Sequence, residues 1–394
     1  MGCKYDFDSV VDRKNTSSLK YDFGMERKKR EDLLPLWVAD MDFSLPNEVL
    51  DDITDRVKHG IFGYTDPKDD YFEIIQNWYD TQYGFQVQKD WVLVTPGVVF
   101  ALALAIRAYT NEGDAVLIQQ PVYYPFSECI VDNNRKLINN QLHYENGKYT
   151  IDFEDFEKKI VENNVKLFLL CNPHNPVGRV WSEKELLQIG NICIKYGVII
   201  VADEIHADFV YGDRKHLVFA SLNDEIKENC IICSSPSKTF NIAGLQISNI
   251  IIPNKKLHHM FQLEMWKTGY SQVNTIGLSA TKAVYTKGYE WYIQLKEYLW
   301  NNYLFAKEFI KENIPGIHVI ESEGTYLLWL DCSGLGLTEE ELEDLIINKA
   351  KLWLDAGAIF GKETGLFQRI NYACPRSVLE QALLQLKRAV NEND

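Results

Sequence analysis

The chain has 394 residues, of which 46% are hydrophobic and 25% are charged, and its formal net charge is −15 at pH 7. This composition is typical of a globular protein, and the length allows one large domain and a smaller one. The acidic balance argues against nucleic acid or an anionic membrane as the main partner. No run approaches the roughly 18 apolar residues of a membrane span, and the amino terminus shows no apolar signal core. We therefore expect a cytoplasmic protein.

Strand and helix patterns alternate along the first two thirds of the chain. Apolar runs predict strands at residues 91–95, 115–118, 167–171, 198–202, 230–233 and 247–252. Between them, residues 98–109 and 183–196 have the apolar spacing of helices. Such an alternation is typical of a mostly parallel sheet that is covered by helices.

After residue 254 the pattern changes to long helices rich in Lys, Glu and aromatic residues, which continue to about residue 312. Farther along, short strands are predicted at 317–320, 327–330 and 369–372, and helices at 338–355 and 376–391. This change predicts a second, smaller domain. Because no flexible linker separates the two parts, we expect a continuous helix to join them.

Two polar segments follow predicted strands in the first part of the chain. Asn172-Pro-His-Asn-Pro-Val-Gly-Arg179 comes after the strand at 167–171, and Asp203-Glu-Ile-His206 comes after the strand at 198–202. An open parallel sheet places its site at the carboxyl ends of its strands. These polar residues are therefore candidates for a shared site.

A third segment, Ser235-Pro-Ser237-Lys238-Thr239, follows the predicted strand at 230–233. The amine of Lys238 is placed to form a Schiff base with an aldehyde cofactor, whose phosphate the neighbouring hydroxyls would hold. By itself Ser-x-Lys is a weak pattern, and a solvated surface lysine is the alternative interpretation.

Cys230 and Cys233 form a Cys-x-x-Cys pair, which raises the possibility of a metal or redox site. No second pair and no nearby histidine at a ligand spacing accompanies them. Positions i and i+3 of a strand also point to opposite faces. We predict two small buried residues and no metal site.

Taken together, the three polar segments, in this order, resemble the pyridoxal phosphate (PLP) enzymes of the class I/II aminotransferase fold. Residues 34–43, 59–65 and 121–126 further resemble the MalY/PatB group of carbon–sulfur β-lyases, which includes cystalysin-like enzymes. The resemblance runs over nearly the whole chain. It implies fold type I: an α/β large domain at 47–285 with a mostly parallel seven-stranded sheet between helices, and a smaller α+β domain at 286–394. Residues 1–46 would form an amino-terminal arm and part of the small domain.

A PLP site needs a covalent lysine, an anion site for the phosphate, a carboxylate for the pyridine nitrogen and a flat surface for the ring. Lys238 is the covalent candidate, and Asp203 is the candidate for the ring nitrogen. The helix that starts at Gly97 offers free backbone N–H groups to the phosphate. The other expected phosphate contacts are Val98, Val99, Ser235 and Ser237, with Tyr64 reaching over from the partner subunit of a homodimer. Asn175 is expected to contact the 3-oxygen of the cofactor, and Tyr123 to stack on its ring. His206 is a further expected cofactor contact.

The resemblance also implies a set of substrate-binding residues. The α-carboxylate of an amino acid needs a bidentate cation, and Arg369 matches the family's carboxylate-binding arginine. Ala39, Asn175 and Tyr124 are the other expected substrate contacts. Lys238 would remove the Cα proton, and Tyr123 or Tyr124 would assist at the leaving sulfur.

Two departures from typical aminotransferases, together with the MalY/PatB-like segments, imply β-elimination from a sulfur amino acid such as L-cystathionine, L-cysteine or a related cysteine S-conjugate. His206 stands where a tyrosine is usual, and Gln246 stands where a phosphate-binding arginine or lysine is usual. An aminotransferase using the same site is an alternative. A MalY-like regulatory protein that retains the lyase site is another.

Overall fold

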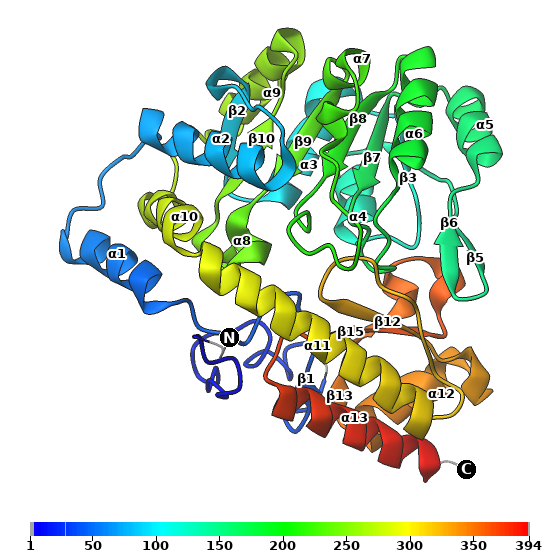
Figure 1. Ribbon diagram of the computed structural model, residues 1–394. Coiled ribbons are helices and arrows are strands. Elements are labelled where there is room, and N and C mark those ends of the chain that lie inside the picture. The colour runs from blue at the N-terminus through cyan, green and yellow to red at the C-terminus, as the bar shows by residue number, and fades with distance from the viewer. Residues whose placement is uncertain (1–3, 28, 393–394) are drawn as a thin grey trace.

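The computed structural model describes residues 4–27 and 29–392. Residues 1–3, which belong to the amino terminus considered above, lie outside this range. The chain folds around a seven-stranded sheet and a four-stranded sheet (Figure 1). The other strand pairs of the described part are β1 (Leu34–Pro35) with β13 (Leu352–Trp353), and β5 (His143–Glu145) with β6 (Lys148–Thr150).

The seven-stranded sheet lies between two layers of helices. Its strand order is β2 (Val92–Thr95), β10 (Ser248–Ile251), β9 (Cys230–Ser234), β8 (Ile199–Asp203), β7 (Leu167–Cys171), β3 (Ala115–Ile118) and β4 (Lys136–Asn139). β10 pairs antiparallel with β2 and β9, and every other pair of neighbouring strands in this sheet is parallel. The predicted mostly parallel seven-stranded sheet is confirmed.

β4 is the strand of this sheet that the sequence did not reveal. It lies at the sheet edge, and Ile138 is its one buried residue. A strand with so little apolar character gives no periodic signal. Its parallel pairing with β3 makes it a strand, and that pairing is a long-range contact.

Alternate residues of the central strands pack into two cores, one on each face of the sheet. Cys230 and Cys233 lie in opposite cores and both are buried, as predicted. No group of His, Cys, Asp and Glu within the described ranges could hold a metal ion. One core includes α2 (Asp69–Tyr83), α5 (Phe153–Asn163), α6 (Glu183–Lys195) and α10 (Thr275–Lys287), and the other includes α3 (Val98–Tyr109), α4 (Pro125–Asp132) and α9 (Lys255–Lys267).

The four-stranded sheet is antiparallel and belongs to the carboxyl-terminal part of the chain. Its order is β11 (His318–Val319), β12 (Leu327–Asp331), β15 (Phe367–Asn371) and β14 (Asp355–Ala356). Its helices are α12 (Glu339–Asp344) and α13 (Arg376–Asn391).

The helix predicted at 338–355 ends earlier than expected. A capping box of Thr338 and Glu341 starts α12, and a π-helical segment continues it only to Lys349. Lys351 then has a positive φ of 53°, and the chain enters β13 and β14. The prediction was wrong at this end because pairing with β1 and β15, both distant in sequence, overrides the local helical pattern.

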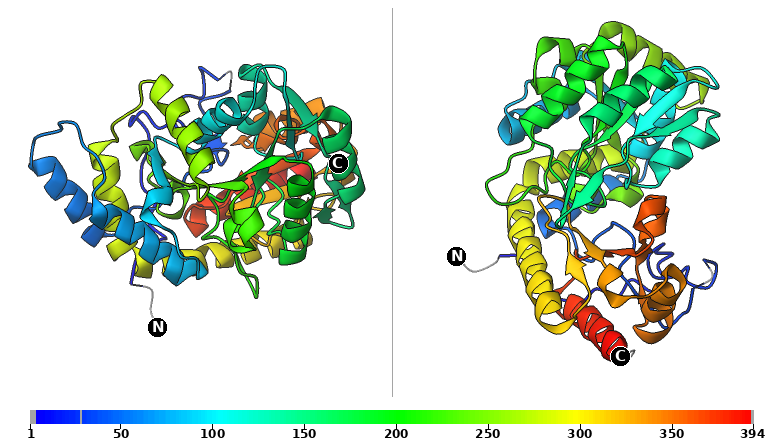
Figure 2. Two further views of the ribbon diagram at one scale, coloured as in Figure 1. Left: turned by 90° about the horizontal axis from the view of Figure 1, so that it is seen from above. Right: turned by 90° about the vertical axis from the view of Figure 1, so that its right-hand side faces the viewer.

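Helix α11 (Tyr289–Asn313) is 25 residues long and contacts both parts of the molecule. Near its start Trp291 stacks on Phe240, and farther along Tyr303 packs on Tyr372. Figure 2 shows α11 running from the helices of the large sheet along the small one. A continuous helix therefore joins the two parts, as expected, while the residue limits of the domains stay a prediction. Helix α1 (Asn47–Lys58) and the loop after it project from the body in Figure 1.

None of the helices in the described part is both long enough and apolar enough to cross a membrane.

Candidate active site

Lys238 lies on α8 (Pro236–Thr239), a one-turn helix directly after β9. The hydroxyl of Ser235 starts this helix by accepting a hydrogen bond from the N–H of Ser237 at 3.0 Å. The amine of Lys238 donates to the carbonyl of Ala39 at 2.7 Å. Desolvation lowers the pKa of this amine to about 8. A lysine with a lowered pKa is a better nucleophile near neutral pH than a surface lysine.

A cavity of about 190 Å³ opens around Lys238 at the carboxyl ends of β7, β8 and β9. Most of the residues selected from the sequence meet here. Those that line the cavity are Ala39, Gly97, Val98, Val99, Tyr123, Asn175, Asp203, His206, Ser237 and Lys238. The carboxyl ends of parallel strands meet at one edge of a sheet, so distant segments converge on one point.

Asp203 ends β8 and is buried beside this cavity. Its carboxyl accepts one hydrogen bond, from the N–H of Ile205 at 3.1 Å. Burial raises the pKa of Asp203 to about 7, while the nearby Lys238 acts to lower it. A carboxyl of this kind is held in its charged form by a cation placed against it. A protonated pyridine nitrogen is such a cation.

His206 lines the same cavity and is buried, and burial holds its pKa well below the ordinary value. Its ring packs edge-on against Tyr326, with 5.6 Å between centroids. Its Nδ1 finds no hydrogen-bond partner anywhere in the described ranges. The imidazole is therefore neutral and retains one nitrogen to contact a bound molecule.

The amino terminus of α3 forms one end of the cavity. Gly97 precedes the helix, and no side chain caps its first N–H groups in the described structure. These N–H groups and the helix dipole attract an anion, and Ser237 and Ser248 add hydroxyl groups to the same cavity. Gln246 is exposed and adds no positive charge there.

Arg369 approaches the cavity from the middle of β15, not from the strand start that the sequence suggested. Its guanidinium is buried and donates to Asn175 Oδ1 and to the carbonyl of Trp37, each at 2.9 Å. It also pairs with the carboxylate of Asp355. Its Nε has no partner among the described residues. Because Asn175 uses its oxygen for Arg369, its NH₂ group is left to donate elsewhere.

Four other predicted residues do not line the cavity. Ser235 donates its hydroxyl to the carbonyl of Ile247 at 2.7 Å, so this residue holds α8 in place. Tyr124 lies behind Tyr123, with 5.2 Å between ring centroids. Tyr64 is 96% exposed in the loop after α1. Arg369 reaches the cavity through its contact with Asn175.

The sequence reasoning missed several lining residues: Pro96, Cys171, Ile205, Ala243, Ile247 and Ser248. Pro96, Cys171 and Ile205 are neighbours of residues that were selected. Ala243, Ile247 and Ser248 follow Lys238 within ten positions, but a short irregular turn separates them from α8. No periodic signal marks such a turn.

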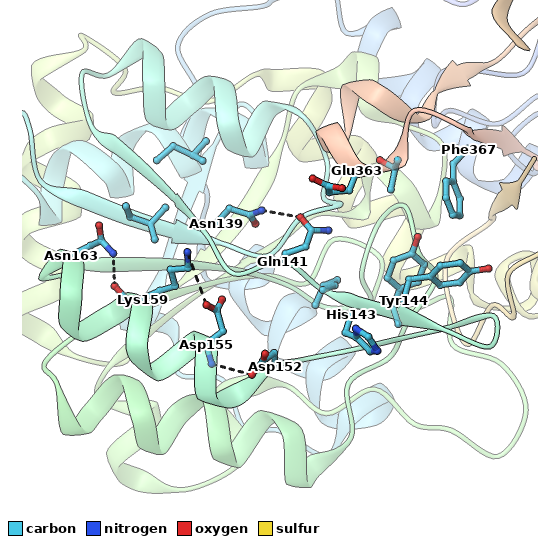
Figure 3. Close-up of a pocket in the computed structure, with 15 residues that line it drawn as sticks. Asn139, Gln141, His143, Tyr144, Asp152, Asp155, Lys159, Asn163, Glu363 and Phe367 are labelled. Atoms are coloured by element: carbon cyan, nitrogen blue, oxygen red, sulfur yellow. Dashed lines mark hydrogen bonds and ion pairs between the residues drawn. The ribbon is translucent and has the colours of Figure 1, made fainter. Parts of the chain in front are cut away.

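A larger cavity of about 850 Å³ lies between α5, the β5–β6 hairpin and the loop before β15 (Figure 3). In this view Phe367 lies over Tyr144 of the hairpin, and Glu363 lies near Gln141. The ring of Tyr144 packs edge-on against Phe367. None of the residues gathered around Lys238 lines this cavity.

The residues around Lys238 fit an aldehyde cofactor with a phosphate and a basic ring nitrogen. The pKa of the Lys238 amine is lowered, the carboxyl of Asp203 has no ion-pair partner among the described residues, and the α3 terminus offers an anion site. Tyr123 supplies an aromatic wall. The predicted ligands thus have the chemistry that such a cofactor requires.

Comparison with known proteins places this arrangement in a family. The profile of the family described as Aminotransferase class I and II matches residues 31–386. Cystathionine beta-lyase PatB of Bacillus subtilis is 39% identical over 98% of this chain and 100% of that protein. Protein MalY of Escherichia coli is 30% identical over 98% of this chain and 99% of that protein.

The crystal structure of cystalysin from Treponema denticola, which contains pyridoxal 5'-phosphate, superposes with a TM-score of 0.96. It is 36% identical and covers 99% of this chain and 100% of that one. The resemblance to the MalY/PatB group and the predicted fold are both confirmed. The chain belongs to the aminotransferase class I and II family.

Proposed function

We propose that this protein is a PLP-dependent carbon–sulfur β-lyase, which cleaves L-cystathionine, L-cysteine or a related cysteine S-conjugate to a thiol, pyruvate and ammonia. The observation that carries the proposal is Lys238, which lies with a lowered pKa in a cavity shared with Asp203 and Asn175. Full-length similarity to proteins named cystathionine beta-lyase, and to cystalysin, supports the same reaction.

When bound, PLP supplies an electron sink for the electron pair that remains at Cα after the proton is removed. Asp203 would hold the ring nitrogen protonated, and the amino terminus of α3 would hold the phosphate. Arg369 would bind the α-carboxylate and orient the substrate. Asn175 already contacts Arg369, so it would join the cofactor end of the cavity to the substrate end.

The amine of Lys238, which lines the cavity, would accept the Cα proton of the substrate. The electron pair of the broken Cα–H bond forms a double bond to Cβ as the Cβ–S bond breaks, and the sulfur leaves as a thiolate. A thiolate leaves readily, so the alignment of the Cα–H bond matters more than strong acid catalysis. Tyr123 borders the cavity, and burial raises the pKa of its hydroxyl, so it would remain protonated and able to donate. Water then hydrolyses the enamine product to pyruvate and ammonia.

We also propose that the protein works as a homodimer in which Tyr64 completes the site of the neighbouring subunit. Tyr64 is on the loop after α1, which projects from the body in Figure 1, together with Ile61 and Phe62, which are 66% and 56% exposed. Large apolar side chains gathered on one projecting loop are typical of an interface. The hydroxyl of Tyr64 would donate a hydrogen bond to the phosphate. It would thereby compensate for the arginine or lysine that is usual at position 246, where this chain has Gln246.

The experiment that tests the function is a pyruvate assay on purified protein with L-cystathionine and, separately, L-cysteine. It is run without any keto-acid acceptor, and Lys238→Ala is the control. Pyruvate and free thiol in equal amounts, absent from the variant, are the expected result. No pyruvate, together with conversion of the cofactor to pyridoxamine phosphate, would instead support an aminotransferase.

A MalY-like regulatory role would be supported if the cofactor bound but neither reaction occurred. The cytoplasmic location expected from the sequence stays a prediction.

A further inference from the structure

The backbone that faces Lys238 is an irregular segment, residues 37–42, with bends at Val38, Ala39 and Asp42. Several of its carbonyl groups accept hydrogen bonds from side chains. The carbonyl of Trp37 accepts a hydrogen bond from Arg369, and the side chain of Asn371 donates to the carbonyls of Val38 and Asp40. The carbonyl of Ala39 accepts from Lys238 at 2.7 Å and from the hydroxyl of Tyr326 at 3.0 Å. The position of this segment therefore determines which backbone group accepts the hydrogen bond from Lys238.

Two cations of the amino-terminal arm hold the acidic side chains of the same segment. Arg13 binds both oxygens of Asp40, at 3.0 and 2.6 Å, and also binds Asp42 at 2.7 Å and the carbonyl of Met41 at 3.1 Å. Lys20 is fully buried and donates to Asp42 at 2.8 Å. Its amine is 3.8 Å from Asp40.

These four side chains form a cluster of two positive and two negative charges. The side chains of Arg13 and Asp40 are 21% and 20% exposed, and that of Asp42 is 4% exposed. An ion pair with a bidentate arginine in such a shielded place has a defined geometry and is screened less than a surface pair. The cluster does not belong to the cofactor or substrate contacts, so its role requires another explanation.

We propose that Arg13 is a positioning residue of the active site, which holds Asp40 and compensates its charge so that Lys238 faces the neutral carbonyl of Ala39. Asp40 follows Ala39, whose carbonyl accepts from Lys238, and without Arg13 its carboxylate would have only Lys20, 3.8 Å away, to offset its charge. The lysine nitrogen would then be held in its protonated form. This inference rests on the proposed role of Lys238 as the residue that binds the cofactor.

Other charged and titratable groups also face Lys238. Arg369 from β15 lowers the pKa of its amine, and Asp203 from β8 raises it. His206 is neutral, and its own low pKa is partly due to the charge of Lys238. Tyr123 lines the same cavity, and Tyr326 donates to the carbonyl of Ala39 that also accepts from Lys238. Burial raises the pKa of both hydroxyls, so they are uncharged. Asp40 acts to raise the pKa of Lys238, and Arg13 is bound to both of its oxygens.

The test is a titration of the visible absorbance of the PLP-bound protein, which reports the protonation of the nitrogen that joins Lys238 to the cofactor. The variants are Arg13→Gln, Asp40→Asn and the double variant, with Arg13→Lys as the conservative one. The matched control is Arg30→Gln, because Arg30 forms a similar pair with Asp32 on the same arm, at 2.7 and 2.9 Å, but in solvent. Borohydride reduction and peptide mapping of each sample establish which lysine holds the cofactor.

We expect Arg13→Gln to raise the titration midpoint by about one pH unit, since the carboxylate of Asp40, the residue after Ala39, is then offset only by Lys20. Asp40→Asn should lower it by a comparable amount, because Arg13 is then the uncompensated charge. The double variant should return close to the starting protein, and Arg13→Lys and Arg30→Gln should shift little. Such a return cannot come from a merely structural loss, which would add up in the double variant.

The proposal is overturned if Arg13→Gln binds the cofactor and titrates like the starting protein, or if the double variant keeps the full shift of Arg13→Gln. If Arg13→Gln does not fold or does not hold the cofactor, Asp40→Asn decides: a downward shift supports the proposal and an unchanged midpoint refutes it. Failure of the proposed function would appear differently, as a cofactor mapped to another lysine or as absent pyruvate from a protein whose titrations behave as expected.

Discussion

The guanidinium of Arg369 donates a hydrogen bond to the side-chain oxygen of Asn175 at 2.9 Å, and so links the small sheet to the loop that follows β7 of the large one. The two residues are 194 positions apart in the sequence. Both are buried, so the contact is shielded from water. It holds the expected carboxylate-binding group in register with the expected cofactor-binding group.

This link leads to a prediction about substrate binding. Arg369→Lys keeps a positive charge but loses the planar fork that binds a carboxylate with two hydrogen bonds. We expect KM for the amino acid to rise by roughly 10- to 100-fold, with a smaller change in kcat. Steady-state kinetics of pyruvate release measure both, and an unchanged KM would remove Arg369 from the substrate site.

The second prediction concerns the covalent link to the cofactor. Lys238→Ala should abolish the absorbance at about 420 nm that a lysine-bound cofactor gives. Borohydride reduction followed by mass spectrometry should then find no cofactor attached to the chain. Lys296→Ala removes another partly buried lysine and is the control, since it should leave the band in place. A retained covalent band in Lys238→Ala would show that the lysine assignment is wrong.

The third prediction concerns the stability of the cofactor-free protein. Burial raises the pKa of Asp203 from 3.8 to about 7, so the folded state holds a proton there that the unfolded chain releases. The free energy of unfolding should therefore fall as pH rises from about 4 to about 7, and this loss persists at higher pH. The asparagine of the Asp203→Asn variant cannot ionise, so the free energy of unfolding of this variant should not fall over that pH range.

We expect the cofactor-free Asp203→Asn protein to be more stable than the starting protein above neutral pH, by roughly 1 to 4 kcal/mol. The difference should vanish in mild acid, below the ordinary pKa of the carboxyl. Urea denaturation at both pH values measures it, and a cofactor titration should show weaker PLP binding by the same variant. Equal stability at all pH values would contradict the buried, unpaired state of Asp203.

The fourth prediction tests whether two subunits share a site. Tyr64→Ala and Lys238→Ala should each be poorly active or inactive as pure proteins. Mixing them under conditions that exchange subunits should restore activity, because one site of the mixed dimer contains both native residues. The Lys238→Ala protein taken through the same subunit exchange by itself is the control, since both of its sites lack the lysine. No recovery in a mixture shown to contain mixed dimers would place Tyr64 outside the neighbouring site.

Local sequence indicated six of the seven strands of the large sheet and most of the residues that line the cavity around Lys238. The central strands are continuous apolar runs, because both of their faces are buried, and polar residues follow them where the strands end. Asp203, Asn175 and Lys238 could be selected for this reason. Edge strand β4 could not, because its polar residues become a strand only through pairing with β3.

Tertiary structure determined everything that depends on distant segments. The end of α12 was set by the pairing of β13 with β1 and of β14 with β15, which no local pattern announces. The same holds for the hydrogen bond from Lys238 to the carbonyl of Ala39, which joins residues 199 positions apart. It also holds for the pair of Arg13 and Asp40, which are 27 positions apart. The sequence by itself determined which residue types were available for chemistry, since a strand's apolar pattern is local. Only the fold decided which of them meet, because burial and hydrogen bonding depend on segments that are far apart along the chain.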